Sequence, residues 1–412
     1  MAQHDIARRE DHKPQQFVAP VPVRRAEPVE APAHPLSILP PSKTAPVTAD
    51  QAQAGAVAAG LGELGKPATA ENKTAPATPP TEQSNPNDAQ QRQIVTEQME
   101  ALKEAKHIIR PGDKSADAQL LQRQLKQLGL HIEETGVMDK DTQAVVKAIQ
   151  TGGGLGPDGV VGPKTIDMLL TLDKAPSKPK TTDGGDGQGG DTSDHMPDDP
   201  KLAAVYLFNR MRAANASDSL TPQQEKDMER FVKNWESNKA RYQQVAETTG
   251  VPAKLIASLH WRESTGDFGT YLHQGDPLGK KAVNEPANIP IFDEWEPAAE
   301  HALGMKKGIR DAFKIDENTS DEAALTSYAE RYNGLGYFNY RAMASPYVYS
   351  GSDQYKKGKY VGDGNWDPNH KDQQLGVLPM MRRIDRFERE LAEKAAKERE
   401  EQNKDPNQHF AQ

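Results

Sequence analysis

Aromatic residues are distributed very unevenly along this chain of 412 residues. It contains 11 Tyr, 9 Phe and 4 Trp, but only Phe17 precedes Tyr206. Because large aromatic side chains contribute much of the buried area of a protein core, the main packed core is expected in the second half. Hydrophobic residues make up only 35% of the chain, beside 32 Gly and 31 Pro. Long segments therefore bury too little apolar surface to offset their ordering entropy.

Two segments have the composition of unfolded chain. Residues 1–88 are rich in Pro, Ala, Thr and Gln, which predicts a disordered region that is compatible with docking to a partner. Residues 174–200 are Gly- and Asp-rich and predict a flexible linker. The GGDGQGGDTSD sequence within this linker suggests a calcium loop, but loops of that type need tandem repeats to stack. Between the two segments, residues 89–113 predict a solvated helix and a connector.

A short motif occurs twice in the middle of the chain. GVMDKDT at 136–142 and GVVGPKT at 159–165 are offset by 23 positions, and each precedes an apolar helical run. Asp139 can cap the first of these helices, and Pro163 suits the first position of the second. With a third helix over 119–130, residues 114–173 predict a compact three-helix unit. The alternative is an anonymous helical spacer.

This unit resembles the small peptidoglycan-binding domain found on many cell-wall hydrolases. The residues that carry the resemblance are Leu121, Gln122, Leu125, Leu128, Gly129, Gly136, Val137, Thr142, Ile149, Gln150, Asp158, Gly159, Val160, Val161, Gly162, Pro163 and Thr165. The first half departs from the family pattern, because Met138-Asp139-Lys140 stands where a Phe-Gly-Pro-like turn is usual. The resemblance implies binding to peptidoglycan glycan strands, which concentrates an attached enzyme on an insoluble polymer.

The second half of the chain is mostly helical in pattern. Residues 201–392 predict an α-rich domain, followed by a charged tail over 393–412, so the fold class is mainly α. Helices are expected over 220–250, 251–265, 294–313 and 320–334, with a last helix after 375. Residues 334–370 are rich in Gly, Tyr, Ser and Asp and predict loops, and loops of this length in a compact domain are usually functional.

One acidic residue continues an apolar helix face. In LIASLHWREST, Ile256, Leu259 and Glu263 are related as i, i+3 and i+7. Burial among apolar groups raises the pKa of a carboxyl group, and a glutamic acid that is protonated near neutral pH can donate its proton to a glycosidic oxygen. The alternative is a Glu at a helix end that pairs with Arg262, Lys254 or a distant Arg.

The neighbouring residues favour the catalytic interpretation. WREST at 261–265 resembles the Glu-Ser motif of goose-type lysozymes and soluble lytic transglycosylases, and Arg331-Tyr332-Asn333-Gly334 resembles a helix end of the same clan. The Gly-Leu-Met-Gln segment of classical transglycosylases is missing, and YLHQGDPLGK stands in that region. A closer resemblance, over about 255–376, is to phage-type lysozyme-like domains. It implies cleavage of the β-1,4 bond between N-acetylmuramic acid and N-acetylglucosamine, with Glu263 as general acid/base and without a cofactor.

Several further residues are candidates for this site. Asp276, in HQGDPL, is a candidate second carboxylate that stabilises an oxocarbenium-like transition state or positions water, and the alternative is a turn residue. Candidates for substrate contact are Ser264, His273, Tyr332, Asn333 and Tyr347. Ten aromatic residues between Tyr328 and Trp366 suit stacking on sugar faces, or a local core for the loops. The sequence does not separate hydrolysis from the cyclising transglycosylase reaction.

Other functional classes find less support. The net charge of −9 argues against nucleic acid as the main partner, and the absence of cysteine excludes disulfides and thiolate metal sites. His260, His273 and His301 do not form a His-Glu-x-x-His motif, which argues against a zinc amidase or peptidase. A non-catalytic, peptidoglycan-binding component of a phage tail or injection machine remains the main alternative.

The location of action is also an expectation from the sequence. The first 20 residues lack the apolar segment of a signal peptide, and no apolar run reaches membrane-spanning length. We therefore expect action in the periplasm or on the cell wall without membrane insertion, reached by non-Sec export, holin-dependent release or a phage or injection device. The partner of residues 1–88 and the existence of an immunity protein are left open by the sequence.

Overall fold

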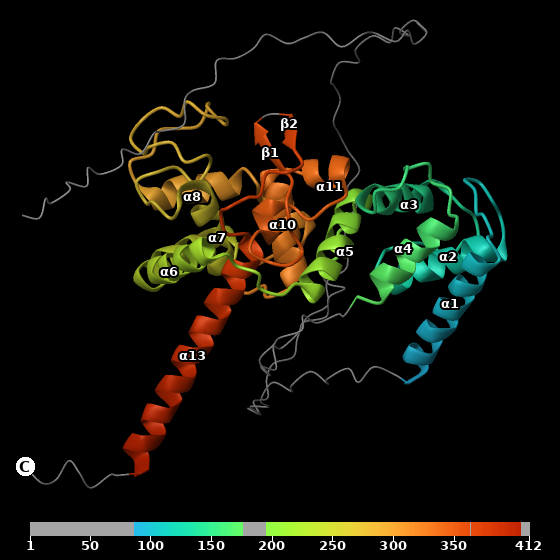
Figure 1. Ribbon diagram of the computed structural model, residues 1–412, viewed down its shortest axis with the longest axis horizontal. Helices are drawn as coiled ribbons and strands as arrows, with labels where there is room; N and C mark the ends of the chain where they lie inside the picture. Colours follow the sequence, from blue (N-terminus) through green and yellow to red (C-terminus); the bar gives the residue numbers. More distant parts are fainter. Residues whose placement is uncertain (1–85, 176–194, 363, 405–412) are drawn as a thin grey trace, which may run out of the picture. The chain divides into compact units, whose positions relative to one another are not determined.

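The computed structural model describes residues 86–175, 195–362 and 364–404 (Figure 1). The described residues are mainly helical, as the sequence predicts, with thirteen helices and one two-stranded sheet. Most of the predicted disordered region (1–88) and of the predicted linker (174–200), including GGDGQGGDTSD, lies outside the described residues, as does the end of the tail. Among the described helices, none is long and apolar enough to cross a membrane.

The first four helices contain the predicted three-helix unit. They are α1 Pro86–Glu104, α2 Ala116–Gln127, α3 Lys140–Gly152 and α4 Pro163–Asp173. Asp139 caps α3 through its side chain and Pro163 begins α4, both as predicted from the sequence. Helix α1 was expected to be solvated, but Val95 and Met99 are buried where it packs against α2 and α4.

The repeated motif has a structural basis in two buried glutamines. Gln122 of α2 accepts a hydrogen bond from the Gly136 backbone N–H at 2.8 Å and donates one to the next carbonyl at 2.9 Å. Gln150 of α3 makes the same pair of bonds with the loop at Gly159, at 2.9 Å each. Both side chains are almost fully buried. In each repeat a buried glutamine side chain therefore supplies hydrogen bonds to the backbone N–H and C=O groups of the loop. Polar groups that are removed from water need such partners.

The remaining helices form the α-rich domain. They are α5 Pro200–Asn215, α6 Pro222–Thr249, α7 Ala253–Ser264, α8 Trp295–Gly304, α9 Lys307–Ala312, α10 Glu322–Asn333, α11 Gly336–Arg341, α12 Pro346–Tyr349 and α13 Val377–Lys404. Helix α10 lies at the centre of this domain and contacts α5, α7, α9, α12 and α13 (Figure 1). Its inner side chains Leu325 and Tyr328 are completely buried, so α10 is the main core helix.

Two expectations about the elements need correction. The single helix expected over 294–313 is divided into α8 and α9. The segment 334–370, expected to consist of loops, also contains α11, α12 and a hairpin formed by β1 Lys359–Gly362 and β2 Asn365–Asp367. The last helix, expected after 375 and into the charged tail, is α13, which continues to Lys404.

Candidate active site

Helix α7 carries Glu263 close to its C-terminal end. Leu255, Ile256 and Leu259 are completely buried, and α7 packs against α6 and α13, so the predicted apolar face is confirmed. Glu263 continues this face but remains partly exposed. The helix ends at Ser264, and the residue that follows, Thr265, adopts a left-handed conformation with φ of 55°. Glu263 is thus held by a rigid, packed helix at the point where the helix reaches the surface.

The surroundings of Glu263 favour its protonated form. Burial raises the pKa of the Glu263 carboxyl above its usual value, because the charged form loses contact with water. A hydrogen bond from the Tyr347 hydroxyl to Oε1 at 2.7 Å, together with the charges of Arg262 and Lys306, opposes this effect without cancelling it. A glutamic acid with a raised pKa and a fixed hydrogen-bond partner has the properties of a general acid.

Two cations that the sequence offered as partners of Glu263, Lys254 and Arg262, are engaged elsewhere. The Lys254 ammonium pairs with Asp385 at 2.7 Å, and the Arg262 guanidinium pairs with Asp372 at 3.0 Å. In the described part of the chain, Glu263 has no ion-pair partner within salt-bridge distance. The structure therefore shows no ion pair of Glu263 with Lys254, Arg262 or another arginine of the described residues.

The loop after α7 folds back against Glu263. A Cβ atom placed on Gly275 would lie 3.0 Å from the Glu263 carbonyl oxygen, so this close approach suits only glycine, which here has φ of +80°. The Tyr332 hydroxyl of α10 donates a hydrogen bond to the Leu272 carbonyl at 3.2 Å. Glu263, Tyr332 and the HQGDPL loop, which are separate in the sequence, are thus brought together.

Asp276 is committed to the structure of its own loop. Its carboxylate accepts hydrogen bonds from the Val283 backbone N–H at 2.7 Å and from the Asn284 backbone N–H and side chain at 2.9 and 2.6 Å. Burial raises the pKa of Asp276, but these hydrogen bonds outweigh burial and leave the pKa below its usual value. These contacts favour the turn interpretation that the sequence left open. Both carboxylate oxygens already accept hydrogen bonds within the loop, so few lone pairs remain to stabilise a transition state.

The other candidate residues are divided among three places. Asn333 is exposed and lines a groove together with Tyr347. His273 instead pairs with His301 through a hydrogen bond of 2.9 Å, and burial together with His301 and Lys306 lowers the pKa of His273 to about 4. Ser264 hydrogen-bonds to the backbone carbonyl of His260 in its own helix, at 3.4 Å. Only Tyr347 contacts the carboxyl group of Glu263 by a hydrogen bond.

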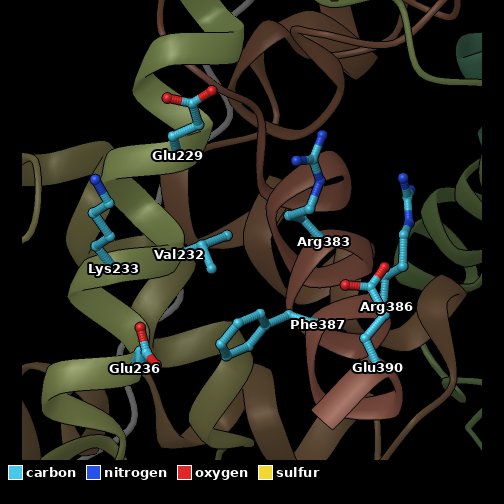
Figure 2. A pocket seen from close by; sticks show the side chains of 8 residues that line it. All are labelled: Glu229, Val232, Lys233, Glu236, Arg383, Arg386, Phe387 and Glu390. Atoms are coloured by element: carbon cyan, nitrogen blue, oxygen red, sulfur yellow. The ribbon is translucent and has the colours of Figure 1, made fainter. Parts of the chain in front are cut away.

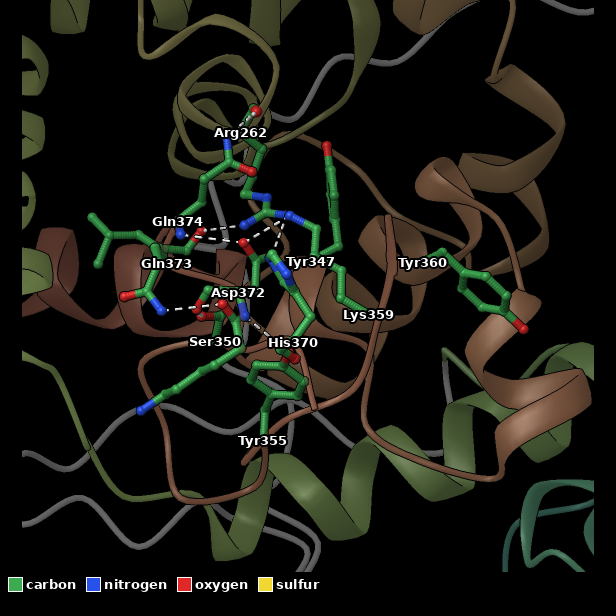
Figure 3. Close-up of polar contacts among 12 residues, drawn as sticks. Arg262, Tyr347, Ser350, Tyr355, Lys359, Tyr360, His370, Asp372, Gln373 and Gln374 are labelled. Carbon is green, nitrogen blue, oxygen red and sulfur yellow. Dashed lines mark hydrogen bonds and ion pairs between the residues drawn. The ribbon is translucent and has the colours of Figure 1, made fainter. Parts of the chain in front are cut away.

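A buried ionic network lies next to Tyr347 (Figure 3). Asp372 is 1% exposed and pairs with Arg262 at 3.0 Å and with Lys359 at 2.9 Å. The Arg262 guanidinium also lies over the Tyr347 ring, 4.7 Å from its centroid, and donates a hydrogen bond to the Leu375 carbonyl at 3.1 Å. This network fixes the ring whose hydroxyl group contacts Glu263.

A groove of about 460 Å³ runs beside this network. It is lined by Arg262, Asn333, Gly334, Gly336, Tyr337, Pro346, Tyr347, Lys359, Tyr360, Val361, Gly362 and Asp372. Glu263 is not among the lining residues, but Tyr347 both lines the groove and contacts Glu263. At the hairpin end, Tyr337 and Tyr360 pack edge to face with centroids 5.2 Å apart, and Trp366 packs against both. Polar groups and aromatic rings of this kind suit a sugar chain.

The aromatic-rich segment contributes both to the core and to the wall of the groove. Tyr328, Phe338 and Tyr349 are completely buried and belong to the core. Tyr337 and Tyr360 line the groove instead. The crowding of aromatic residues therefore reflects a core and a groove wall built from the same stretch of chain.

A second groove lies between α6 and α13 (Figure 2). Its lining includes two apolar side chains, Val232 and Phe387. The other lining residues carry charges of both signs, namely Glu229, Lys233, Glu236, Arg383, Arg386 and Glu390. None of the candidate site residues lines this groove. Among the described residues, no group of three or more His, Asp or Glu side chains is placed to hold a metal ion.

Three important residues of the site were not identified from the sequence as functional. The sequence indicates Arg262 only as a possible ion-pair partner of Glu263, and no motif marks Lys359 or Asp372. Asp372 lies 110 residues after Arg262, and no spacing rule joins positions that far apart. The only local signal was the concentration of lysines and tyrosines in the segment SPYVYSGSDQYKKGKYVGDG.

The Tyr347 hydroxyl gives a testable prediction for pH dependence. Its hydrogen bond stabilises the charged form of Glu263, so Tyr347→Phe should raise the pKa of Glu263 further. If Glu263 must be protonated to act, the basic limb of the rate profile should move to higher pH in this variant. A pH titration of the Glu263 carboxyl by NMR in parent and variant measures the change in pKa, and a lower pKa in the variant would contradict the role assigned to this hydrogen bond.

Comparison with known families identifies one part of the chain. Residues 114–169 match the family model of the peptidoglycan binding domain. No curated protein and no solved structure matched the chain in the corresponding searches. The matched residues span α2, α3 and the first part of α4, together with the two loops that Gln122 and Gln150 hold. The match is confined to residues 114–169, and it supports association of the chain with peptidoglycan at the cell wall.

Proposed function

We propose that the α-rich domain is a peptidoglycan-cleaving glycosidase, either a muramidase or a lytic transglycosylase, with Glu263 as its general acid/base. The observation that carries the proposal is the partly buried Glu263 carboxyl, with its raised pKa and its hydrogen bond to Tyr347 at the edge of a groove. The peptidoglycan-binding domain in the same chain supports the choice of polymer.

The proposed reaction begins with proton transfer from Glu263 to the oxygen of the β-1,4 bond between N-acetylmuramic acid and N-acetylglucosamine. Cleavage leaves positive charge on the muramic acid ring and a carboxylate on Glu263. The Tyr347 hydroxyl then stabilises this carboxylate through the hydrogen bond that it already makes. In the second step the carboxylate removes a proton from the attacking oxygen, which is water in hydrolysis or the 6-hydroxyl of the same sugar in transglycosylation.

The environment of Asp276 supports a mechanism with a single acid/base. Its carboxylate is held by Val283 and Asn284 and its pKa is lowered, so it serves its loop and is not a partner of Glu263 in the proposed reaction. Cleavage with one carboxyl group is compatible with both outcomes of the second step.

Mass spectrometry of the fragments released from purified sacculi tests this proposal. Muropeptides with reducing ends would establish hydrolysis, and 1,6-anhydro ends would establish transglycosylation. Activity should persist after treatment with a chelator, whereas loss of activity with the chelator would favour a metal-dependent amidase or peptidase. Binding of the protein to sacculi without release of any fragment would favour the non-catalytic structural alternative.

A further inference from the structure

We propose that Lys359 recognises a carboxylate of the glycan substrate, so that the groove selects acid-bearing peptidoglycan over neutral polymers of the same sugars. This inference rests on the proposed function and names the substrate chemistry of the same groove. It is carried by the position, the charge balance and the unused hydrogen-bond donors of the ionic network beside Tyr347.

The position of Lys359 allows it to reach both the network and a ligand. It lies at the start of β1 and lines the groove with Tyr347 and Tyr360 (Figure 3). Its ammonium group donates to Asp372 Oδ1 at 2.9 Å, yet 27% of its side chain remains exposed, whereas Asp372 is 1% exposed. The lysine is therefore the member of the network that faces solvent in the groove.

The charges that line the groove do not balance. Its charged lining residues are Arg262, Lys359 and Asp372, so two cations face one carboxylate and one positive charge is left over. Glu263 is not among the residues that line the groove. The whole chain carries a net charge of −9, so a positive groove is a local feature and not a consequence of composition. A ligand group of negative charge complements it.

Hydrogen-bond donors are also left over. A lysine ammonium has three donors, and one of those of Lys359 is used by Asp372. The guanidinium Nε of the buried Arg262 has no hydrogen-bond partner among the described residues. A carboxylate that enters the groove can accept from the free donors of Lys359 while Asp372 keeps its bonds to both cations.

Peptidoglycan offers carboxylates that neutral sugar polymers lack. They come from the lactyl group of muramic acid when the peptide has been removed, and from the acidic residues of the peptide stem when it is present. Both sources present the same group to Lys359. The N-acetylglucosamine residues of the chain carry no charge.

The test measures binding of soluble muramic acid-containing tetrasaccharides to the full chain with the Glu263→Gln substitution, by isothermal titration. Three probes are used: tetrasaccharides with peptide stems, peptide-stripped tetrasaccharides, and the same stem-bearing molecules with carboxylates converted to amides. We expect the amidated probe to bind about tenfold more weakly than the native one, since a charge-assisted hydrogen bond is lost. The stripped probe identifies whether the lactyl or the stem carboxylate is recognised.

Lys359→Met should remove this tenfold preference, and Lys359→Arg should retain most of it. Lys357→Met is the matched control, because Lys357 is exposed, bonds to Asn369 at 2.8 Å and does not line the groove. Equal binding of native and amidated probes by the parent protein would overturn the inference, as would equal weakening by both methionine substitutions. Because the readout is binding, it decides the inference even if the wild-type protein releases no fragments from sacculi, which would overturn only the proposed function.

Discussion

Glu263→Gln is expected to reduce the release of fragments from sacculi by about 10²–10⁴-fold, the usual contribution of a general acid. The amide has nearly the volume of the carboxyl group and keeps an oxygen that can accept from Tyr347, but it has no proton to transfer. The peptidoglycan-binding domain is unchanged, so binding to sacculi should persist. Release of soluble muropeptides and pelleting with sacculi, measured on the same samples, separate the two properties.

Loss of stability is not expected to explain this effect. The pKa of Glu263 is raised in the folded state. The protonated Glu263 side chain therefore contributes to the free energy of unfolding below the unfolded-state pKa, and this contribution is lost as pH rises through the folded-state pKa. At neutral pH the glutamine variant should therefore unfold no more easily than the parent. Glu247→Gln is the matched control, because Glu247 is exposed on α6 and should leave activity unchanged. Wild-type activity in Glu263→Gln would refute the catalytic assignment.

Asp372→Ala is expected to lower the free energy of unfolding by about 3–5 kcal/mol, the usual cost of removing one member of a buried ion pair. The substitution leaves the Arg262 guanidinium, whose side chain is 5% exposed, without its anionic partner, and it also removes the partner of Lys359. Urea unfolding followed by circular dichroism measures the change. Asp293→Ala, at an exposed position, is the control and should cost far less.

The effect of Asp372→Ala should depend on pH in a defined direction. Burial raises the pKa of Asp372, but Arg262 and Lys359 outweigh burial and leave the pKa below its usual value. The stabilisation is therefore present above the unfolded-state pKa and is lost as pH falls through the lowered folded-state pKa. The difference between variant and parent should shrink on acidification. A difference that is small at neutral pH, or that grows as pH falls, would contradict the role assigned to this network.

Local sequence patterns predicted the helices and one catalytic candidate. The spacing of Ile256 and Leu259 fixed the buried face of α7 because helix periodicity is a local property, and it placed Glu263 at the end of that face. The repeated loops of the peptidoglycan-binding domain were visible for a similar reason, since capping residues lie beside the helices that they begin.

The parts of the site that the sequence did not predict depend on contacts between distant residues. The pairing of Arg262 with Asp372, and the positions of Tyr347 and Lys359 around them, follow from the packing of α7, α12 and the hairpin. For the same reason the sequence could not decide between the two roles of Asp276. Its carboxylate is bound by the backbone N–H groups of Val283 and Asn284, and a contact to a backbone group leaves no mark in the residue types. Burial and ion pairing across such separations are properties of the folded chain.

The proposed mechanism depends on the Glu263 carboxyl, beside the groove, keeping its proton to a higher pH than an ordinary glutamate does. A pH titration by ¹³C NMR of protein labelled at glutamate carboxyl carbons, with the Glu263 signal assigned by its loss in Glu263→Gln, measures this directly. The structure predicts a midpoint above the ordinary glutamate pKa of about 4.3. A midpoint at or below that value would mean that Glu263 is an ordinary carboxylate at neutral pH and is not the acid that cleaves the glycan.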